Sequence, residues 1–363
     1  MALTSSGEIS LGGTTAGRSV NLELGQAAGA TITMNDTNLR SLFGVASGQI
    51  SMSSGYGKSS QFSTGIVQGS GTAGTPRGVG IVSYSFTTDT PTTETAVLSG
   101  GQSEGGGTNT PAFGYSHGGT RSPTTTKGDI YRWTFGSRTS ALIAATMKSV
   151  GPASSGGRQY TGAVNSTTRG YVGGGRNESP LASPQFSEID GLIFSTEAAI
   201  DPAAALAQAR FFISGTNSST TGYFHGGHYI TGFIQTGQID GITFSTEAAV
   251  NPAASLVQAR GAGGSNSSGT KGYVGGGYSA PVSSAPVTQI DGILFSTEAA
   301  IDPAAGLATA FTQRANHQGM HSSTSGYFHS GPTSTKINFS TETTASCTPT
   351  GVAAGTAFQN SPN

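Results

Sequence analysis

An internal repeat is the feature that most limits what this chain can fold into. The element Gly-Tyr-x-x-Gly-Gly begins at Gly114, Gly170, Gly222 and Gly272, returns in degenerate form at Gly326, and has a weaker copy at Gly65. Successive copies start 49 to 56 residues apart. This period is typical of the blades of a β-propeller and too long for most helical repeats.

Two further elements recur between these copies. Ile-Asp-Gly followed by Phe-Ser-Thr-Glu occupies 189–197, 239–247 and 290–298, and shorter forms lie near Ile81, Ile130 and Ile337. Its alternating β-branched and aromatic residues are typical of half-buried strands. An arginine also stands 12 residues before four of the Gly-Tyr pairs, at Arg158, Arg210, Arg260 and Arg314.

Each unit therefore predicts four strands: an inner strand led by the arginine, the Gly-Tyr strand, the Ile-x-Gly strand and an outer strand near Glu-Ala-Ala. Asp or Asn followed by Pro, at Asp201, Asn251 and Asp302, predicts a single helical turn after the outer strand.

Six such units fill residues 61–363 and predict an all-β, six-bladed propeller. The segment from Gly351 to Phe358 resembles an inner strand, and the chain stops where another Gly-Tyr would follow. We expect this segment to pair with the strand at Gly65, so that both chain ends share one blade and leave no open sheet edge.

The order of elements within a unit resembles kelch-like propellers. The resemblance rests on the double glycine Gly226-Gly227, the aromatic Phe244, and Leu256 followed by Arg260. The tryptophan usual in kelch outer strands is missing, since Trp133 is the single tryptophan of the chain. The resemblance implies the fold and carries no function.

Residues 1–60 do not repeat and predict a small N-terminal module of short strands and one short helix. The helix is expected from Thr37 to Phe43, with Asp36 as its cap. A module of this size buries too little core to be stable alone, so it should pack on a partner or on copies of itself.

The N-terminal module resembles one found on virion proteins of tailed bacteriophages, including tail fibres. The matching motifs are Ile-Ser-Leu at Ile9, Glu-Leu-Gly at Glu23, Gly-x-Ile-Ser-Met at Gly48 and Tyr-Gly-Lys-Ser at Tyr56. The resemblance implies a module that docks on the particle. It therefore implies a virion protein, made in the host cytoplasm and bound to tail or baseplate proteins, with a trimer as the first expectation for its oligomer.

Composition argues against several other classes. Only 10% of residues are charged and the net charge is −1, whereas proteins that coat DNA or membrane surfaces carry a basic excess. No apolar run reaches the roughly 18–20 residues that span a bilayer, and the first residues lack the features of a signal peptide. Cys347 is the single cysteine, which excludes an internal disulfide or a cysteine metal cluster. We expect no nucleic-acid partner, no membrane insertion and no cofactor.

Two sets of repeated polar residues could indicate chemistry. His117, His225 and His329 hold equivalent places in alternate blades, which suggests either a metal site or, as we expect, packing and hydrogen bonding. The repeated acids Asp190, Asp240 and Asp291, with Glu197, Glu247 and Glu298, could be paired carboxylates of a glycosidase. Since they recur once per blade, structural ion pairs with the repeated arginines, or hydrogen bonds in turns, are the simpler interpretation, and we expect no enzyme activity.

The segments after the double glycines differ most between repeats and should all emerge on one face. They carry the candidate receptor-binding residues Arg176, Asn177, Tyr229, Phe233 and Tyr278. Such aromatic and polar groups stack on sugar rings and hydrogen-bond hydroxyls, although unconstrained loops would look the same. The sequence favours a phage tail-fibre or receptor-binding protein that contacts a host surface glycan. The alternatives are a purely structural virion component and a glycan-cleaving enzyme.

Overall fold

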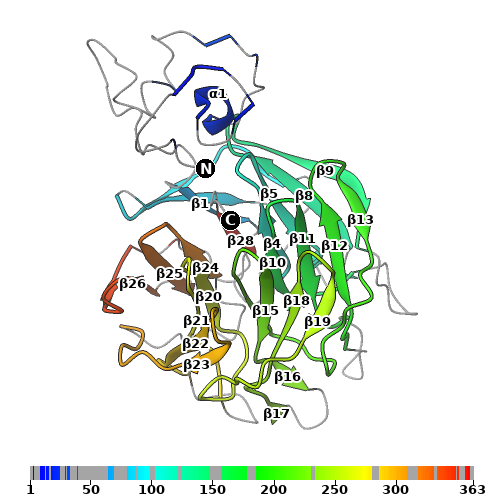
Figure 1. Cartoon of the computed structure of the whole chain (residues 1–363), viewed down its shortest axis with the longest axis vertical. Helices are drawn as coiled ribbons and strands as arrows, with labels where there is room; N and C mark the ends of the chain where they lie inside the picture. Colours follow the sequence, from blue (N-terminus) through cyan, green and yellow to red (C-terminus); the bar gives the residue numbers. More distant parts are fainter. Residues whose placement is uncertain are drawn as a thin grey trace.

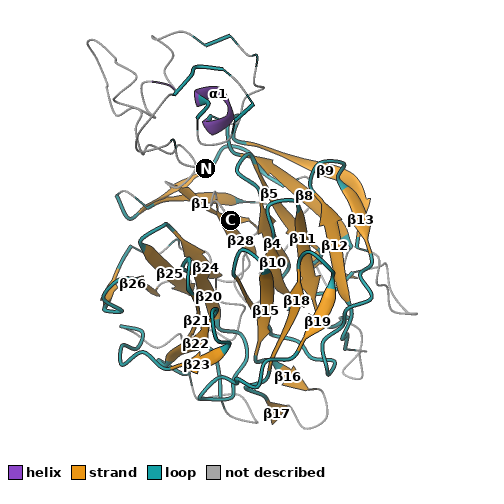
Figure 2. Ribbon diagram, viewed as in Figure 1, coloured by secondary structure: helices purple, strands orange, loops and turns teal. Residues whose placement is uncertain are grey.

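The chain forms an all-β propeller of six blades, as the repeats predict (Figure 1). The computed structural model describes residues 3, 9–12, 14–15, 18–24, 29, 31–32, 39, 64–68, 80–86, 88–98, 103–121, 125–126, 128–147, 157–177, 185–229, 234–279, 286–308, 318–330, 333–348, 350 and 356–359. Strands make up almost all of the regular structure in these residues (Figure 2).

Every blade is an antiparallel sheet of four strands, ordered from the axis of the ring outward. Blade one contains β28 (Thr356–Gln359), β1 (Thr64–Gln68), β2 (Ile81–Ser85) and β3 (Thr90–Thr93). Blade two contains β4 (Gly106–Asn109), β5 (Phe113–His117), β8 (Asp129–Thr134) and β9 (Thr139–Thr146). Blade three contains β10 (Gly162–Asn165), β11 (Arg169–Gly173), β12 (Ile189–Ile193) and β13 (Ala198–Ile200).

The other three blades follow the same plan. Blade four contains β14 (Ser214–Asn217), β15 (Thr221–His225), β18 (Ile239–Thr243) and β19 (Ala248–Val250). Blade five contains β20 (Gly264–Ser267), β21 (Lys271–Gly275), β22 (Ile290–Leu294) and β23 (Ala299–Ile301). Blade six contains β24 (Gln318–His321), β25 (Ser325–Ser330), β26 (Thr333–Asn338) and β27 (Thr344–Ser346). Two short hairpins, β6–β7 (Thr120–Arg121, Thr125–Thr126) and β16–β17 (His228–Tyr229, Ile234–Gln235), project from blades two and four.

The ring closes through the C-terminal strand, as predicted. β28 pairs antiparallel with β1, with Gly65 opposite Gln359 and Gln68 opposite Thr356. The innermost strands contact one another in a closed circle, in the order β28, β4, β10, β14, β20, β24 and back to β28. Residues 351–355 of the predicted strand lie outside the described residues.

The Gly-Tyr pair explains how neighbouring blades pack. A Cβ on Gly170 would lie 2.5 Å from Oγ1 of Thr108 in the preceding blade, and one on Gly222 would lie 2.3 Å from Cγ2 of Val164. Because strand residues alternate between faces, the tyrosine that follows each glycine points into the next blade. There the Tyr171 ring stacks on Phe244, with ring centroids 5.7 Å apart.

The predicted helical turn after the outer strand is not formed. Residues 201–206 contain no helix, and the backbone N–H of Leu206 donates to the carbonyl of Ser187 at 2.8 Å. Leu206 is buried in the core of blades three and four. Burial of this leucine against the sheet therefore outweighs the local Asp-Pro helix signal.

The described part of the N-terminal module contains the helix α1 (Val20–Glu23), capped by Ser19 (Figure 2). A helix in this segment was not predicted. Val20 packs with Leu3 and Leu39 in a small cluster, so burial of its apolar side chains decides the local structure. Of the helix predicted from Thr37 to Phe43, the described residues include only Leu39, which is helical. No helix among the described residues is long and apolar enough to cross a membrane.

Candidate functional site

The repeated arginines and aspartates form buried ion pairs within single blades. Arg158 pairs with Asp190 at 2.5 Å. Equivalent pairs in the next two blades join Arg210 to Asp240 and Arg260 to Asp291. All six side chains are at most 4% exposed, and each arginine also donates to backbone carbonyls, as Arg210 does to Gly226 and Phe224. The structural interpretation of these aspartates is confirmed. Arg314 lies outside the described residues.

The repeated glutamates have different partners from those expected. Each lies in the turn before an outer strand and accepts a hydrogen bond from the tyrosine of the preceding blade, at 2.8 to 3.2 Å. The pairs are Tyr115–Glu197, Tyr171–Glu247, Tyr223–Glu298 and Tyr273–Glu342. Most also pair with a cation of that preceding blade, as Arg169 does with Glu247 at 2.7 Å. The predicted pairing of these glutamates with the repeated arginines was therefore wrong, because the turn reaches across the seam between blades.

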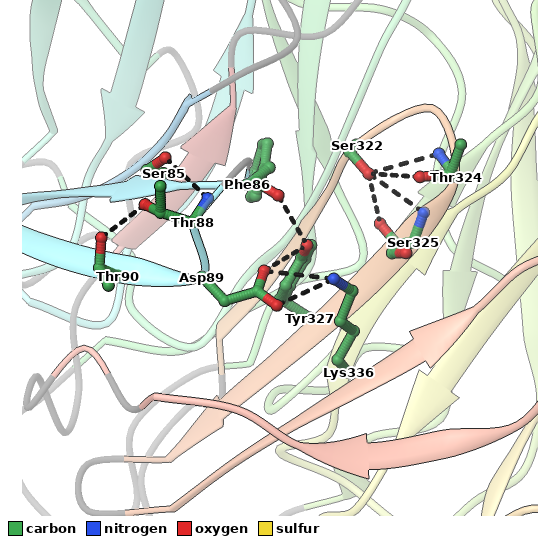
Figure 3. A network of polar contacts seen from close by, with 10 residues as sticks. All are labelled: Ser85, Phe86, Thr88, Asp89, Thr90, Ser322, Thr324, Ser325, Tyr327 and Lys336. Carbon is green, nitrogen blue, oxygen red and sulfur yellow. Dashed lines mark hydrogen bonds and ion pairs between the residues drawn. The ribbon is translucent and has the colours of Figure 1, made fainter.

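The seam that closes the ring uses the same contact, with an aspartate in the turn. Tyr327 of blade six donates to Asp89 of blade one, and Lys336 pairs with the same carboxylate (Figure 3). The two contacts measure 2.8 and 2.9 Å. Tyr327 also stacks on Phe86, with centroids 5.0 Å apart. The two ends of the chain are thus joined by side chains as well as by β28.

The three repeated histidines have the packing and hydrogen-bonding role that we expected. His117 and His225 bond the hydroxyls of Thr108 and Thr216 at 2.7 Å, and His329 bonds Ser334 at 2.6 Å. Burial lowers the pKa of His225 to about 3, and the charges of Arg210 and Arg260 act in the same direction. Burial also lowers the pKa of His117 to about 4. These rings are therefore neutral near neutral pH.

The depressed histidine pKa values predict a stability that falls on mild acidification. Below pH 6.5 these histidines bind protons in the unfolded chain but not in the folded chain. Each of them therefore lowers the free energy of unfolding by about 1.4 kcal/mol between pH 7.5 and 5.5. The variant His225→Gln introduces the residue that blade one has at the equivalent position, Gln68. Between pH 7.5 and 5.5 it should lose about 1.4 kcal/mol less of its free energy of unfolding than the parent does. Urea unfolding of both proteins at the two pH values measures the difference. An equal loss in both would contradict a neutral, buried His225.

The segments after the double glycines share one face of the ring, which we call the double-glycine face. In blades two to five an isolated bridge joins the residue after the second glycine to a residue before the inner strand. These bridges are Ser103–Thr120, Gln159–Arg176, Phe211–His228 and Gly261–Tyr278. The second glycine also donates to the next blade, as Gly175 does to the carbonyl of Arg210 at 2.9 Å. The framework of this face is thus repeated while its side chains differ.

A second set of variable residues runs around the axis on the same face. Glu104, Tyr160, Phe212 and Ala262 each precede an inner strand and have φ between 58° and 66°. Their backbones are linked from blade to blade, since Tyr160 donates to Glu104, Phe212 to Tyr160 and Ala262 to Phe212 at 2.7 to 2.9 Å. Non-glycine residues at such φ values are strained, and such strain is often found at functional sites.

These positions bring together an aromatic cluster in blades two to four, which we call the ring-face cluster. It consists of Glu104, Tyr160, Arg176, Phe211, Phe212 and His228. The Tyr160 and Phe212 rings lie 4.0 Å apart between centroids, and the Phe212 and His228 rings lie 5.3 Å apart. The guanidinium of Arg176 lies 4.6 Å from the centroid of Phe211 and 5.1 Å from that of Tyr160. Phe211 is buried, and Tyr160, Phe212 and His228 are half-buried.

Polar groups at the ring-face cluster retain unused hydrogen-bonding capacity. Tyr160 donates to the carboxylate of Glu104 at 3.0 Å. Arg176 Nε and His228 Nε2 are buried atoms without a hydrogen-bond partner among the described residues, and Glu104 is only 9% exposed. Burial, and then the charge of Arg176, lowers the pKa of His228 to about 4. The cluster therefore offers aromatic faces, a guanidinium, a neutral imidazole and a carboxylate within a small area.

The candidate receptor-binding residues are only partly brought together. Arg176 lies in the ring-face cluster, and Tyr229 follows His228 and donates to Gln238 at 3.2 Å. Asn177 and Tyr278 lie in segments that we expected to emerge on one face, but they are only 4% and 7% exposed. The backbone of Tyr278 is bridged to Gly261, and the expectation that its side chain is available at this face was wrong. Phe233 lies outside the described residues.

Tyr160, Phe211, Phe212, Glu104 and His228 were missed in the sequence. A signal for three of them is present, because the two residues after each repeated arginine differ. They are Gln-Tyr after Arg158, Phe-Phe after Arg210 and Gly-Ala after Arg260. Since the arginine leads the inner strand, its neighbours lie close to the axis, where a ligand can contact several blades at once.

Comparisons with known proteins do not add to this site. Within the described part of the chain, no group of three or more histidine, cysteine or acidic side chains is placed to hold a metal ion. No model of a known protein family matches the chain, and no curated protein matches it.

Proposed function

We propose that this protein is a tail-fibre or receptor-binding protein of a bacteriophage virion and that its double-glycine face binds a host surface glycan. The observation that carries the proposal is the ring-face cluster. The face of a sugar ring stacks on aromatic rings such as Tyr160 and Phe212, while Arg176 and His228, which are half-buried, are suited to hydrogen-bonding its hydroxyls. The N-terminal motifs support a module that docks on tail or baseplate proteins.

The arrangement of the repeated polar groups favours binding over catalysis. The repeated aspartates and glutamates are used in ion pairs and in the seams between blades. The residues that vary between blades are instead grouped on one face of a rigid ring. A scaffold of this kind lets contact residues change without disturbing the core, which suits a protein that recognises a host surface.

Several copies on one particle would multiply weak contacts. Stacking and hydrogen bonds to a single sugar give low affinity, but linked copies raise the effective concentration by orders of magnitude. We therefore expect weak glycan binding by the isolated chain together with strong adsorption of the particle. An oligomer formed through the N-terminal module, with a trimer as first expectation, would serve this purpose.

The test is the double variant Phe212→Ala with Arg176→Thr in assembled particles. Both replacements introduce residues that other blades already have at the equivalent positions, namely Ala262 in blade five and Thr120 in blade two. The variant should fold normally and lose at least about ten-fold in adsorption rate, because stacking and charged hydrogen bonds of about 1 kcal/mol or more each are removed. Tyr278 is unsuitable for such a test because its ring is buried.

A matched control is Leu142→Ala on the outer strand β9, whose side chain is 51% exposed and lies away from the cluster. It should adsorb like the parent. If the double variant folds, is incorporated and also adsorbs like the parent, the ring-face cluster is not the receptor site. A purely structural virion component would then be the better proposal, whereas release of reducing sugar from host glycan would support an enzyme.

A further inference from the structure

One of the six seams between blades lacks the tyrosine that fills the others. Between blades one and two the Gly-Tyr strand carries Ile66 in place of tyrosine. The phenylalanine on which the tyrosine would stack is present as Phe135, which follows β8 as Phe194 follows β12. The tyrosine side chain is therefore missing at this seam, while the phenylalanine that it would stack on is present.

A cavity of about 110 Å³ lies at this seam. It is lined by Thr64, Ile66, Ser83, Glu94, Trp133, Phe135 and Arg138. Ile66 and Trp133 are only 1% exposed and provide an apolar floor. The Arg138 side chain is 55% exposed at the rim, so the cavity is accessible from solvent.

The charge at this seam is also reversed. Arg138 has φ 55° and occupies the turn position that Glu197, Glu247 and Glu298 hold in the next three blades. Its Nε donates to Glu94 of blade one at 2.8 Å, and it also donates to Ser83 at 3.0 Å. Burial acts to raise the pKa of Glu94, but hydrogen bonds from Arg138 and Ser83 outweigh it and lower the pKa. The Arg138–Glu94 ion pair thus lies at the position where, in the other seams, the tyrosine hydroxyl donates to a carboxylate.

We propose that this cavity, which we call the seam pocket, binds a single hydroxylated aromatic ring, with the ring between Ile66, Trp133 and Phe135 and the hydroxyl at the Arg138–Glu94 pair. The other seams indicate the occupant, because in five of them a phenol ring fills the equivalent space and its hydroxyl bonds a carboxylate. The volume leaves room for at most one ring, since the cavity is smaller than the apolar cavity of about 150 Å³ that binds benzene in another protein. A bulkier fused or branched group would not fit.

The chain offers a specific probe, because Trp133 is its single tryptophan and lines the seam pocket. The full-length protein is titrated with p-cresol, the side chain of tyrosine, and indole emission is excited at the red edge, where phenols absorb little. We expect a saturable change with a Kd on the order of 1 mM, as suits a ligand of so few atoms. Toluene, which lacks the hydroxyl, should bind at least about three-fold more weakly.

Ile66→Tyr should fill the pocket with the chain's own ring, raise the melting temperature and weaken p-cresol binding at least ten-fold. Ile66→Val is the matched control and should bind p-cresol as the parent does. Should Ile66→Tyr not fold, Arg138→Gln still tests the site, because it should abolish the preference for p-cresol over toluene. A linear, non-saturating response of the parent, or unchanged binding by Ile66→Tyr, would overturn the proposal.

The source of the ring is distinguished by a second ligand. A Gly-Tyr-Gly peptide that binds as tightly as p-cresol supports a tyrosine of another polypeptide as the occupant. Binding of p-cresol without binding of the peptide supports a free phenolic molecule. Because the seam pocket and the ring-face cluster share no residue, failure of either test leaves the other unaffected.

Discussion

A chain that ends before β28 is expected to lose most of its stability. Deleting residues 356–363 removes the innermost strand of blade one, so the backbone of β1 loses its partner from Gly65 to Gln68. Contacts of β28 with β4 and β24 are lost at the same time, which opens the ring. We expect the free energy of unfolding to fall by about 5 kcal/mol or more, from several hydrogen bonds and the packing around them.

For a protein of this size such a loss lowers the melting temperature by about 7 °C or more, which thermal unfolding followed by circular dichroism measures. Deleting only residues 360–363 leaves β28 whole and is the matched control, with a melting curve expected to equal that of the parent. If the two truncations melt at the same temperature, the ring is not held closed by this strand.

Breaking one buried ion pair should have the second largest effect. Asp240→Ala leaves the guanidinium of Arg210, which is fully buried, without its counter-charge, and it removes the acceptor of the Ala207 N–H. An uncompensated charge in such a place costs about 3–5 kcal/mol. Denaturant unfolding should show this loss as a lower midpoint with an unchanged slope.

Two further variants separate charge from packing. Arg210→Met with Asp240→Thr removes both charges and should recover about 2 kcal/mol or more relative to Asp240→Ala. The threonine has a precedent in blade six, where Thr335 accepts from the Ala308 N–H at 3.1 Å. Arg169→Ala breaks a pair whose side chains are 37% and 26% exposed, and it should cost no more than about 1 kcal/mol. A loss for Asp240→Ala as small as that for Arg169→Ala would contradict the buried-charge argument.

Much of the framework could be predicted from the repeats. The number of blades, the order of strands within a blade and the closure through the C-terminus follow from the spacing of Gly-Tyr, Ile-x-Gly and arginine. The buried pairing of Asp190, Asp240 and Asp291 with arginines follows from their recurrence in successive units, since a catalytic pair is needed only once. These features depend on local residue patterns and on their repetition, and both can be recognised in a single sequence.

The candidate site could be predicted only in part. Variation after the double glycines indicated Arg176, but it gave no information on which side chains would fold back. Tyr278 is buried whereas Arg176 and His228, which have the equivalent backbone bridge, are half-buried, so the exposure of these side chains depends on the residues packed around them and not on the repeated backbone pattern. Phe212 and Tyr160 meet because the backbones of consecutive blades are hydrogen-bonded around the axis.

By itself, the sequence determined the propeller, because six copies of one hydrophobic pattern can bury their faces only by packing against one another. Only the tertiary structure decided which side chains meet at the seams between the repeated blades. Each Tyr–carboxylate contact joins residues about 70 to 80 positions apart or, for Tyr327 and Asp89, 238 positions apart. The ring-face cluster and the seam pocket both arise there, because their side chains belong to different blades and are brought together only when neighbouring blades pack.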